Sequence, residues 1–291
     1  MRDNRPRHAL VTGAASGIGR AICMELARSG WTICVADIDS AGGAETVALV
    51  ERAGGKAEFY KLDVTSEHEW ASLRDHLQAC WPSIELVVNN AGVCAGGELA
   101  STEISTWDWV HAINLRGAML GCHTFIPWMR ENPQDSFLMN MSSIAGLVFS
   151  PRMAVYNSTK AALVALSETL HAELKPYNIS VTAVCPWFSP TNLLRTGRFA
   201  EKAEADYAEG QMATSTVTPE VVAKQGLAAT LRKRPVCVVG GTARFLAWLG
   251  RWFPSVLRML IVLWSAKIKK DPIPPAAEAP KPVEVPEEKV S

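Results

Sequence analysis

The sequence lacks several features that would assign it to whole classes of protein. Its 29 basic residues balance 29 acidic ones, so the composition gives no sign of a nucleic-acid partner. None of its seven cysteines belongs to a CxxC pair or to a Cys/His cluster, which argues against a zinc site or a disulfide framework. We therefore expect no bound metal, and buried, reduced thiols in a cytoplasmic protein.

Long apolar segments are also missing. The N-terminus is basic and polar and has no apolar stretch of the length that a signal peptide needs, so we expect no secretion. The longest uncharged run near the C-terminus, 259–266, has eight residues, whereas a helix needs roughly 20 to span a bilayer. Because 48% of the residues are hydrophobic and 20% are charged, the composition predicts a globular core.

What the sequence does contain is a repeated alternation of short apolar strands and amphipathic helices. The predicted strands are 8–11, 32–36, 57–62, 84–88, 137–141, 179–185 and 236–239. The first predicted helix follows the glycine-rich turn and carries Ile18, Ala21, Ile22 and Leu26. The other predicted helices cover 40–53, 66–80, 106–129, 156–175 and 219–231. This alternation predicts an α/β fold with a parallel sheet that helices cover on both faces. The polar run 187–216 is predicted to be irregular and long enough to form a functional lid.

The first predicted strand leads directly into a glycine-rich turn, TGAASGIG at 12–19, and then into a helix. In that setting Gly13 permits a sharp turn. Gly17 and Gly19 let the backbone approach a pyrophosphate at the helix N-terminus, where free N–H groups favour anions. The alternative is a plain tight turn that binds nothing.

The second predicted strand ends in Asp37, 18 residues after Gly19, near the spacing at which an acidic residue binds the adenine ribose hydroxyls. A carboxylate there repels a 2′-phosphate, and neither Ser16 nor Ile38 offers a basic group to hold one. The pattern therefore favours NAD over NADP. The alternative is that Asp37 only caps the following helix.

Tyr156 and Lys160 lie four residues apart in a predicted helix and therefore share one face. A nearby ammonium lowers the pKa of a phenol, so the pair is a candidate acid–base device. The alternative is a solvated lysine beside a half-buried tyrosine. Ser143 follows a predicted strand and could converge on the same pocket, or it could simply form a turn. Asn114, on an apolar helix face, could be a satisfied core residue, a helix distortion or a catalytic group.

Taken together, TGAASGIG, NNAG at 89–92, Asn114, Ser143 and YNSTK at 156–160 resemble the short-chain dehydrogenase/reductase family over about residues 7–241. The resemblance implies a single domain with a Rossmann-type, doubly wound parallel sheet of about seven strands. It also implies a nicotinamide cofactor and assembly into homo-oligomers.

The resemblance further implies a role for each motif. Tyr156 would be the general acid/base, while Lys160 would hold the nicotinamide ribose and lower the tyrosine pKa. Ser143 would hydrogen-bond the substrate oxygen, and Asn114 would hold a water molecule in a proton relay. The cofactor-binding residues that it implies are Gly13, Ser16, Gly17, Ile18, Gly19, Asp37, Asp63, Val64, Asn90, Ala91, Gly92, Tyr156, Lys160, Pro186 and Thr191.

One position departs from the family pattern. After Pro186 the family usually has glycine, but here the residue is Trp187, whose indole must point away from the cofactor or narrow the pocket. Together with Phe188, Leu193 and Leu194 it favours an apolar substrate such as a lipid, steroid or retinoid-like alcohol. The alternative is that these side chains pack into the core.

Residues 242–270 form a basic, aromatic-rich extension beyond the family core. Between 244 and 270 there are six basic residues and no acidic one, and the arginines recur every seven residues. This pattern, with a proline at 254, predicts an amphipathic helix that lies on an anionic membrane surface. The alternative is a helix that packs on its own domain or on a partner subunit. Residues 271–291 are rich in proline and glutamate, and we expect them to be disordered.

These observations predict an oxidoreductase that transfers a hydride between NAD(H) and an apolar secondary alcohol or ketone, and that acts at a membrane surface. Two alternatives remain: an NADPH-dependent carbonyl reductase of the 3-oxoacyl type, and a catalytically silent nucleotide-binding scaffold. Asp37 argues against the first, and the complete set of Asn114, Ser143, Tyr156 and Lys160 argues against the second.

Overall fold

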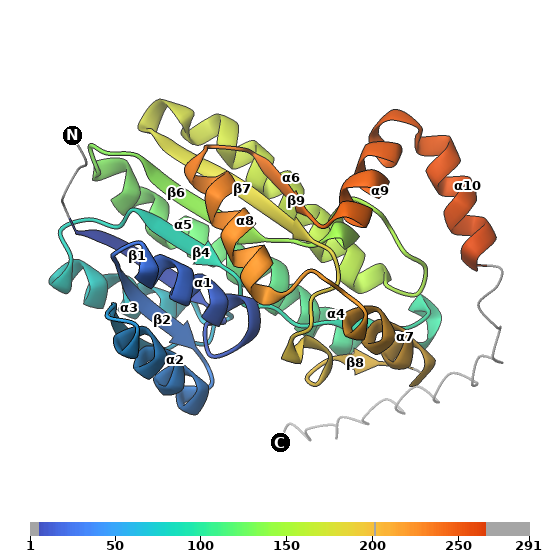
Figure 1. Ribbon diagram of the computed structural model, residues 1–291, viewed down its shortest axis with the longest axis horizontal. Coiled ribbons are helices and arrows are strands. Elements are labelled where there is room, and N and C mark those ends of the chain that lie inside the picture. Colours follow the sequence, from blue (N-terminus) through green and yellow to red (C-terminus); the bar gives the residue numbers. More distant parts are fainter. Residues whose placement is uncertain (1–5, 201, 266–291) are drawn as a thin grey trace, which may run out of the picture.

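The computed structural model describes residues 6–200 and 202–265, and its centre is a parallel sheet of seven strands (Figure 1). The order across the sheet is β3-β2-β1-β4-β6-β7-β9. The strands are β1 Arg7–Thr12, β2 Trp31–Asp37, β3 Lys56–Lys61, β4 Leu86–Asn89, β6 Ser136–Met141, β7 Ile179–Pro186 and β9 Val236–Val239. The predicted α/β fold with a central parallel sheet of about seven strands is confirmed.

Helices cover both faces of the sheet. One layer consists of α1 Gly17–Arg28, α2 Ser40–Arg52 and α8 Pro219–Leu231. The opposite layer consists of α3 Glu67–Cys80, α5 Ala118–Glu131 and α6 Ala154–Leu174. In β1, Ala9 and Val11 face the first layer and Leu10 faces the second. The strands are apolar on both sides because both sides are covered, which explains their continuous hydrophobic runs.

The strand order reverses between β1 and β4, so the connections from these neighbouring strands lead away in opposite directions. A crevice opens beyond the carboxyl ends of the strands at such a point, and ligands of doubly wound folds bind there. The glycine-rich turn follows β1, and the segment 90–92 follows β4. The topology therefore brings two of the predicted motifs to one crevice.

The predicted helix 106–129 is longer than expected and is not uniform. It begins with α4 Ile104–His111 and ends with α5, and a π-helical stretch, Ala112–Gly117, connects the two. This stretch contains Asn114, which is buried. A π-helical turn accommodates an extra residue and often occurs at a functional site. One of the alternatives for Asn114, a distorted helix, is therefore observed.

The prediction that 187–216 is irregular was wrong for part of the segment. Arg198–Phe199 forms β8, which pairs in parallel with β5, Ala95–Gly96, and Lys202–Ala213 forms α7. A mostly polar helix has no apolar stripe for sequence reasoning to detect. Its position instead depends on distant residues: Glu204 forms an ion pair with Arg152, with 2.7 Å between Oε1 and Nε.

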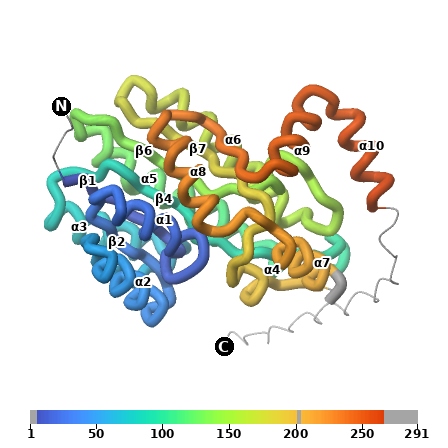
Figure 2. Tube along the Cα trace, viewed as in Figure 1, coloured from blue at the N-terminus to red at the C-terminus, as the bar shows by residue number. Residues whose placement is uncertain are grey.

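The C-terminal extension forms two helices, α9 Gly241–Trp252 and α10 Pro254–Ser265, where a single helix was expected (Figure 2). Proline suits the first position of a helix because it needs no N–H partner there, which explains the break. Ala243, Leu249 and Leu257 pack on Ile144 and Val148, so the extension contacts its own domain. Residues 266–270 and the predicted disordered tail 271–291 lie outside the described residues. Within the described part, no helix has the length and apolarity to cross a membrane.

Candidate active site

The glycine-rich turn after β1 is closely packed. Gly13 and Gly17 have φ angles of +63° and +54°, a conformation that other residues rarely adopt. A Cβ atom on Gly19 would collide with the carbonyl oxygen of Gly13. The Asn90 amide donates hydrogen bonds to the carbonyl oxygens of Thr12 and Gly13, at 3.0 and 3.1 Å. The turn is thus a backbone cradle in front of the α1 N-terminus, and the side chain of Asn90 holds it in place.

Thr12, which sequence reasoning did not select, connects this turn to the segment after β4. Its Oγ1 accepts hydrogen bonds from the backbone N–H groups of Asn90 and Ala91, at 3.0 and 3.2 Å. It also donates one to the Val88 carbonyl oxygen at 3.2 Å. Thr12 is the first letter of the glycine motif, but only the neighbouring strand in the fold reveals its role.

Asp37 lies beside the glycine-rich turn, as its spacing predicts. Its Oδ2 accepts a hydrogen bond from the Ala15 backbone N–H at 2.8 Å, and its Oδ1 accepts one from Asp39 at 3.0 Å. Asp39, not Asp37, caps α2 by accepting from Ala41 and Gly42. The alternative that Asp37 serves only as a helix cap is therefore wrong.

The remaining predicted cofactor-binding residues lie around the same crevice, although several side chains have structural partners. The Thr191 methyl group would be 3.2 Å from a Cβ atom on Gly17, so it faces the glycine-rich turn. Asp63 Oδ1 accepts hydrogen bonds from the backbone N–H and the hydroxyl of Thr65. The other positions are as follows: Ser16 is the N-cap of α1, Ile18 packs against the core, Val64 packs against Gly117, and Pro186 is the buried end of β7.

The acid–base candidates meet at the N-terminal end of α6. Tyr156 is almost fully buried, and the hydroxyl of Ser143, which follows β6, lies close enough to the phenol to lower its pKa. The ammonium of Lys160 lies 5.5 Å from the centre of the Tyr156 ring and donates a hydrogen bond to the Met141 carbonyl oxygen at 2.9 Å. The structure therefore brings Ser143, Tyr156 and Lys160 together, and Lys160 is not a solvated surface lysine.

Burial dominates the proton affinities of this pair. It raises the pKa of Tyr156 well above its usual range; the nearby Cys94 thiol acts in the same direction, and the hydrogen bond with Ser143 acts against it. Burial also lowers the pKa of Lys160 to about 8. The predicted lowering of the Tyr156 pKa by Lys160 is not observed, because loss of water around the phenol outweighs its favourable neighbours.

Asn114 is held by one residue and lies close to two others. Its Oδ1 accepts from the Val93 backbone N–H at 2.8 Å, and its Nδ2 donates to the Val93 carbonyl oxygen at 2.9 Å. A Cβ atom on Gly92 would lie 3.2 Å from Asn114 Oδ1 and 3.5 Å from Lys160 Nζ. Because residue 92 is glycine, this space stays open. It is bordered by the Asn114 amide, the Lys160 ammonium and the segment after β4.

Two further residues that sequence reasoning missed fix the position of Lys160. The Ser142 hydroxyl donates a hydrogen bond to the backbone carbonyl oxygen of Lys160 at 2.8 Å. A Cβ atom on Gly146 would lie 2.6 Å from the same oxygen. The loop after β6 therefore packs directly on the first turns of α6. Neither residue has a signal in the sequence, since both act through close packing of the backbone.

Trp187 points towards the C-terminal extension. It is half-buried and packs against Ile144 and Val148 together with residues of α9 and α10. Its ring centre is 5.3 Å from that of Phe188, which in turn lies 6.4 Å from that of Tyr207 in α7. The alternative that this aromatic run packs into a core is therefore observed for Trp187, while Phe188 links it to the segment predicted as a lid.

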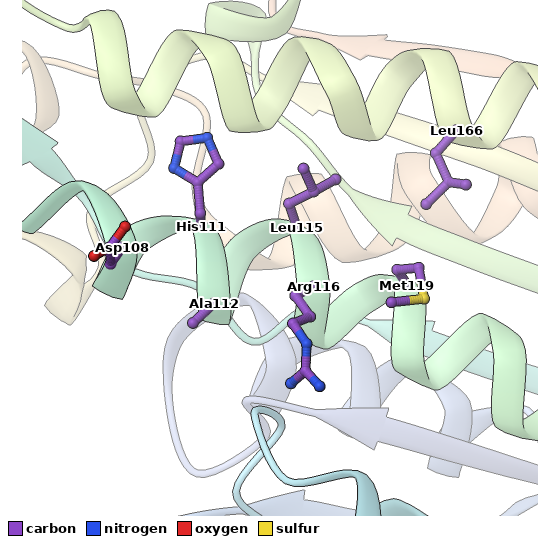
Figure 3. Close-up of a pocket in the computed structure, with 7 residues that line it drawn as sticks. All are labelled: Asp108, His111, Ala112, Leu115, Arg116, Met119 and Leu166. Atoms are coloured by element: carbon purple, nitrogen blue, oxygen red, sulfur yellow. The ribbon is translucent and has the colours of Figure 1, made fainter.

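A separate groove of about 560 Å³ lies on the outer surface of α4, α5 and α6 (Figure 3). The residues that line it are Asp108, His111, Ala112, Leu115, Arg116, Met119 and Leu166. None of the predicted site residues lines this groove, so it is distinct from the crevice at the strand ends. Among the described residues, no group of three or more histidine, cysteine or acidic side chains could hold a metal ion.

Comparison with known proteins identifies the family. The family model described as short chain dehydrogenase matches residues 7–202. The chain belongs to the short-chain dehydrogenase family. A solved structure of a short-chain dehydrogenase/reductase from Burkholderia phymatum in complex with NAD is similar to it, with a TM-score of 0.82 and 26% identity. The alignment covers 88% of this chain and 96% of that one.

Two curated proteins are similar to this chain in sequence. Cyclopentanol dehydrogenase of Comamonas testosteroni is 37% identical over 177 residues, which are 61% of this chain and 70% of the relative. The protein named "Probable oxidoreductase EphD" of Mycobacterium tuberculosis is 32% identical over 256 residues, which are 85% of this chain. The matched part is only 43% of that relative, so this chain spans less than half of its length.

The packing of the glycine-rich turn predicts the effect of Gly19→Ala. We expect nucleotide affinity to fall at least tenfold, and overpacking to destabilise the fold by about 1–3 kcal/mol. Calorimetric titration with NADH and thermal unfolding would measure both. Gly241→Ala is the matched control because a Cβ atom there has no neighbour within 4 Å. If Gly19→Ala bound NADH as tightly as the wild type, the role of the glycine-rich turn in nucleotide binding would be contradicted.

The buried ammonium predicts that Lys160→Met abolishes turnover but raises the free energy of unfolding. A pKa lowered from 10.5 to about 8 means that burying the charge costs the folded protein about 3 kcal/mol at neutral pH. We expect the variant to be inactive and yet more stable below pH 8, by up to that amount less the cost of an unpartnered Met141 carbonyl.

The pH dependence provides a check. Between pH 8 and 10.5 the folded wild type binds fewer protons than the unfolded chain, so its stability rises with pH and the advantage of the variant disappears. Urea unfolding at several pH values measures this difference, and the exposed Lys175→Met is the control. A variant less stable than wild type at pH 7 by several kcal/mol would contradict the prediction.

Proposed function

We propose that this protein is an NAD(H)-dependent oxidoreductase that interconverts a secondary alcohol and a ketone. The observation that carries the proposal is the buried cluster of Ser143, Tyr156 and Lys160 at the mouth of the glycine-lined crevice. The backbone cradle at Gly13, Gly17 and the α1 N-terminus suits a pyrophosphate, which needs N–H donors and close backbone approach. The residues present thus fit a dinucleotide.

The proposed chemistry divides between the nucleotide and the protein. A bound nicotinamide accepts or supplies the hydride. In the direction of oxidation, the Tyr156 hydroxyl oxygen takes the alcohol proton, and in reduction it returns a proton to the ketone oxygen. Ser143, beside Tyr156, donates to the substrate oxygen and stabilises the charge that develops there. Lys160 provides a positive charge beside the phenol. Asn114 borders the small space at Gly92, next to the Lys160 ammonium, and we propose that the proton leaves by this route.

The raised pKa of Tyr156 has a consequence for this scheme. A phenol that holds its proton at neutral pH is prepared to donate it, so ketone reduction needs no change in the ionisation of the free enzyme. Oxidation requires the phenolate, which high pH favours. We therefore propose that the ratio of alcohol oxidation to ketone reduction rises with pH.

The substrate class in the proposal is an apolar alcohol or ketone. Cyclopentanol dehydrogenase is named for a cyclic secondary alcohol, and we extend that substrate type to this chain. Phe149 is exposed in the segment between Ser143 and Tyr156, and the Phe188 ring contacts that of Tyr207. We propose that these aromatic side chains favour a hydrophobic molecule.

The cofactor in the proposal is NAD rather than NADP. Asp37 presents a carboxylate at the end of β2, where a 2′-phosphate would meet its negative charge. The nearby guanidinium of Arg20 is engaged by the Ala15 carbonyl oxygen and by Glu45, which reduces its availability for a phosphate. The NAD complex of the Burkholderia phymatum structure supports the same choice.

Two further parts of the proposal concern partners. The family resemblance implies a homo-oligomer, which light scattering of the purified protein would test. The composition of residues 244–270 favours peripheral contact with a membrane surface. Neither part is needed for the proposed reaction.

The acid–base role predicts the effect of Tyr156→Phe. Removing only the hydroxyl should lower turnover by about 10²–10⁴-fold, the usual contribution of a general acid–base, and leave NADH affinity within about twofold. Initial rates with a panel of secondary alcohols and ketones, followed at the NADH absorbance, measure this effect. Tyr177→Phe removes a hydroxyl from a more exposed tyrosine and should behave as wild type. Retained turnover in Tyr156→Phe would contradict the mechanism.

The carboxylate of Asp37 predicts a cofactor preference. We expect the wild type to bind NADH at least tenfold more tightly than NADPH. We expect Asp37→Asn to narrow that ratio mainly by improving NADPH binding, because the repulsion is gone. Fluorescence titration with both nucleotides measures the four affinities, and the exposed Asp75→Asn is the charge-matched control. Tighter binding of NADPH by the wild type would overturn the assignment.

A further inference from the structure

The hairpin of α9 and α10, residues 241–265, has an outward face that the rest of the described chain does not cover. Ten large apolar side chains of this hairpin are between 36% and 66% exposed. They are Phe245, Trp248, Trp252, Phe253, Val256, Met259, Leu260, Val262, Leu263 and Trp264. A contiguous apolar surface of this kind is unusual on a water-exposed protein and marks a site of interaction.

The exposed side chains of α9 form one stripe with a basic edge. Phe245, Trp248 and Trp252 are three and four residues apart and therefore share a face of the helix. The rings of Phe245 and Trp248 stack with their centres 6.2 Å apart. Arg244 and Arg251, seven residues apart, lie along the neighbouring stripe and are exposed. The surface thus combines bulky aromatic rings with positive charge.

The second helix continues this surface. Val256, Leu260 and Leu263 again recur three and four residues apart and are exposed, while Leu257, on a neighbouring side of the helix, is buried against the domain. Arg258 is the only charged residue of α10, and it is exposed. From 241 to 265 the sequence contains three arginines and no acidic residue.

We propose that the outward face of this hairpin docks on the surface of an anionic lipid bilayer. Each helix has 12 residues, too few to span the hydrocarbon core, so the pair would lie in the plane of the interface. Aromatic rings suit the headgroup level, and arginines are attracted by anionic lipids. A second copy of the chain suits this face less well. In a two-fold contact the hairpins of two copies would face each other, and Arg251 and Arg258 would meet arginines but no acidic residue.

The inner side of the hairpin links this surface to the candidate active site. Leu249 and Leu257 pack on Ile144, in the loop directly after Ser143. At its far end, the Trp264 ring lies 5.7 Å from that of Tyr207 in α7. Docking would therefore hold the entrance of the site next to the bilayer, where apolar alcohols and ketones accumulate. This consequence rests on the proposed reaction, whereas the docking itself does not.

Co-sedimentation of the full chain with vesicles tests the docking. We expect the wild type to sediment with vesicles of phosphatidylcholine and phosphatidylglycerol at low salt, and less with pure phosphatidylcholine or at high salt, where charges are screened. Trp248→Ser/Trp252→Ser should reduce binding at least tenfold. Each arginine near an anionic surface contributes about fivefold to binding, so Arg251→Gln/Arg258→Gln should reduce it about 30-fold.

The matched control is Lys175→Gln/Arg232→Gln. It removes two exposed charges, one at the C-terminal end of α6 and one at that of α8, and should bind vesicles as the wild type does. Wild type that stays in the supernatant with anionic vesicles overturns the proposal. An equal loss of vesicle binding in the control variant also overturns it. The same holds if Trp248→Ser/Trp252→Ser converts a dimer to a monomer without any loss of vesicle binding, because the face would then be a contact between subunits. Unchanged thermal unfolding of each variant excludes misfolding. Turnover of a water-soluble secondary alcohol without vesicles tests the proposed reaction separately.

Discussion

The burial of one ammonium group, that of Lys160, is the constraint on which the rest of the site depends. Its Nζ donates to the Met141 carbonyl oxygen at the end of β6, and its own backbone oxygen accepts from Ser142. Burying a charge is costly unless the structure surrounds it with polar partners. The close packing of Gly146 against α6 and the small space at Gly92 both follow from this arrangement. The Met141 carbonyl oxygen offsets part of this cost.

The same burial sets the proton affinities of the pair in opposite directions. Loss of water favours the neutral form of each group, so it raises the pKa of Tyr156 and lowers that of Lys160 to about 8. The ordinary pKa values of a phenol and an amine nearly coincide, so these shifts move the two groups apart, and at neutral pH the phenol keeps its proton. The Ser143 hydroxyl, in the segment after β6, acts against this rise in the Tyr156 pKa.

Local patterns made most of the fold and part of the site predictable. The approximate strand positions, the glycine-rich turn and the Tyr156–Lys160 pair depend on residues close in sequence, and the parallel sheet follows from the alternation of strands and helices. The features that were missed depend on distant partners. Thr12 acts on the segment after β4, α7 is positioned by the pair of Glu204 and Arg152, and the π-helical stretch coincides with the bonds from Asn114 to Val93. No local pattern encodes such contacts.

Trp187 connects the departure from the family pattern to the C-terminal extension. A glycine at this position would leave a space between the loop after β7 and the loop after Ser143, whereas the indole packs there against Ile144 and residues of α9 and α10. Gly240, with a φ angle of +110° and no side chain, lets the chain pass beside the indole and enter α9. The tryptophan and the hairpin therefore form one packing unit. Because this unit also packs on Ile144, the residue directly after Ser143, the hairpin supports the loop that forms one wall of the candidate active site.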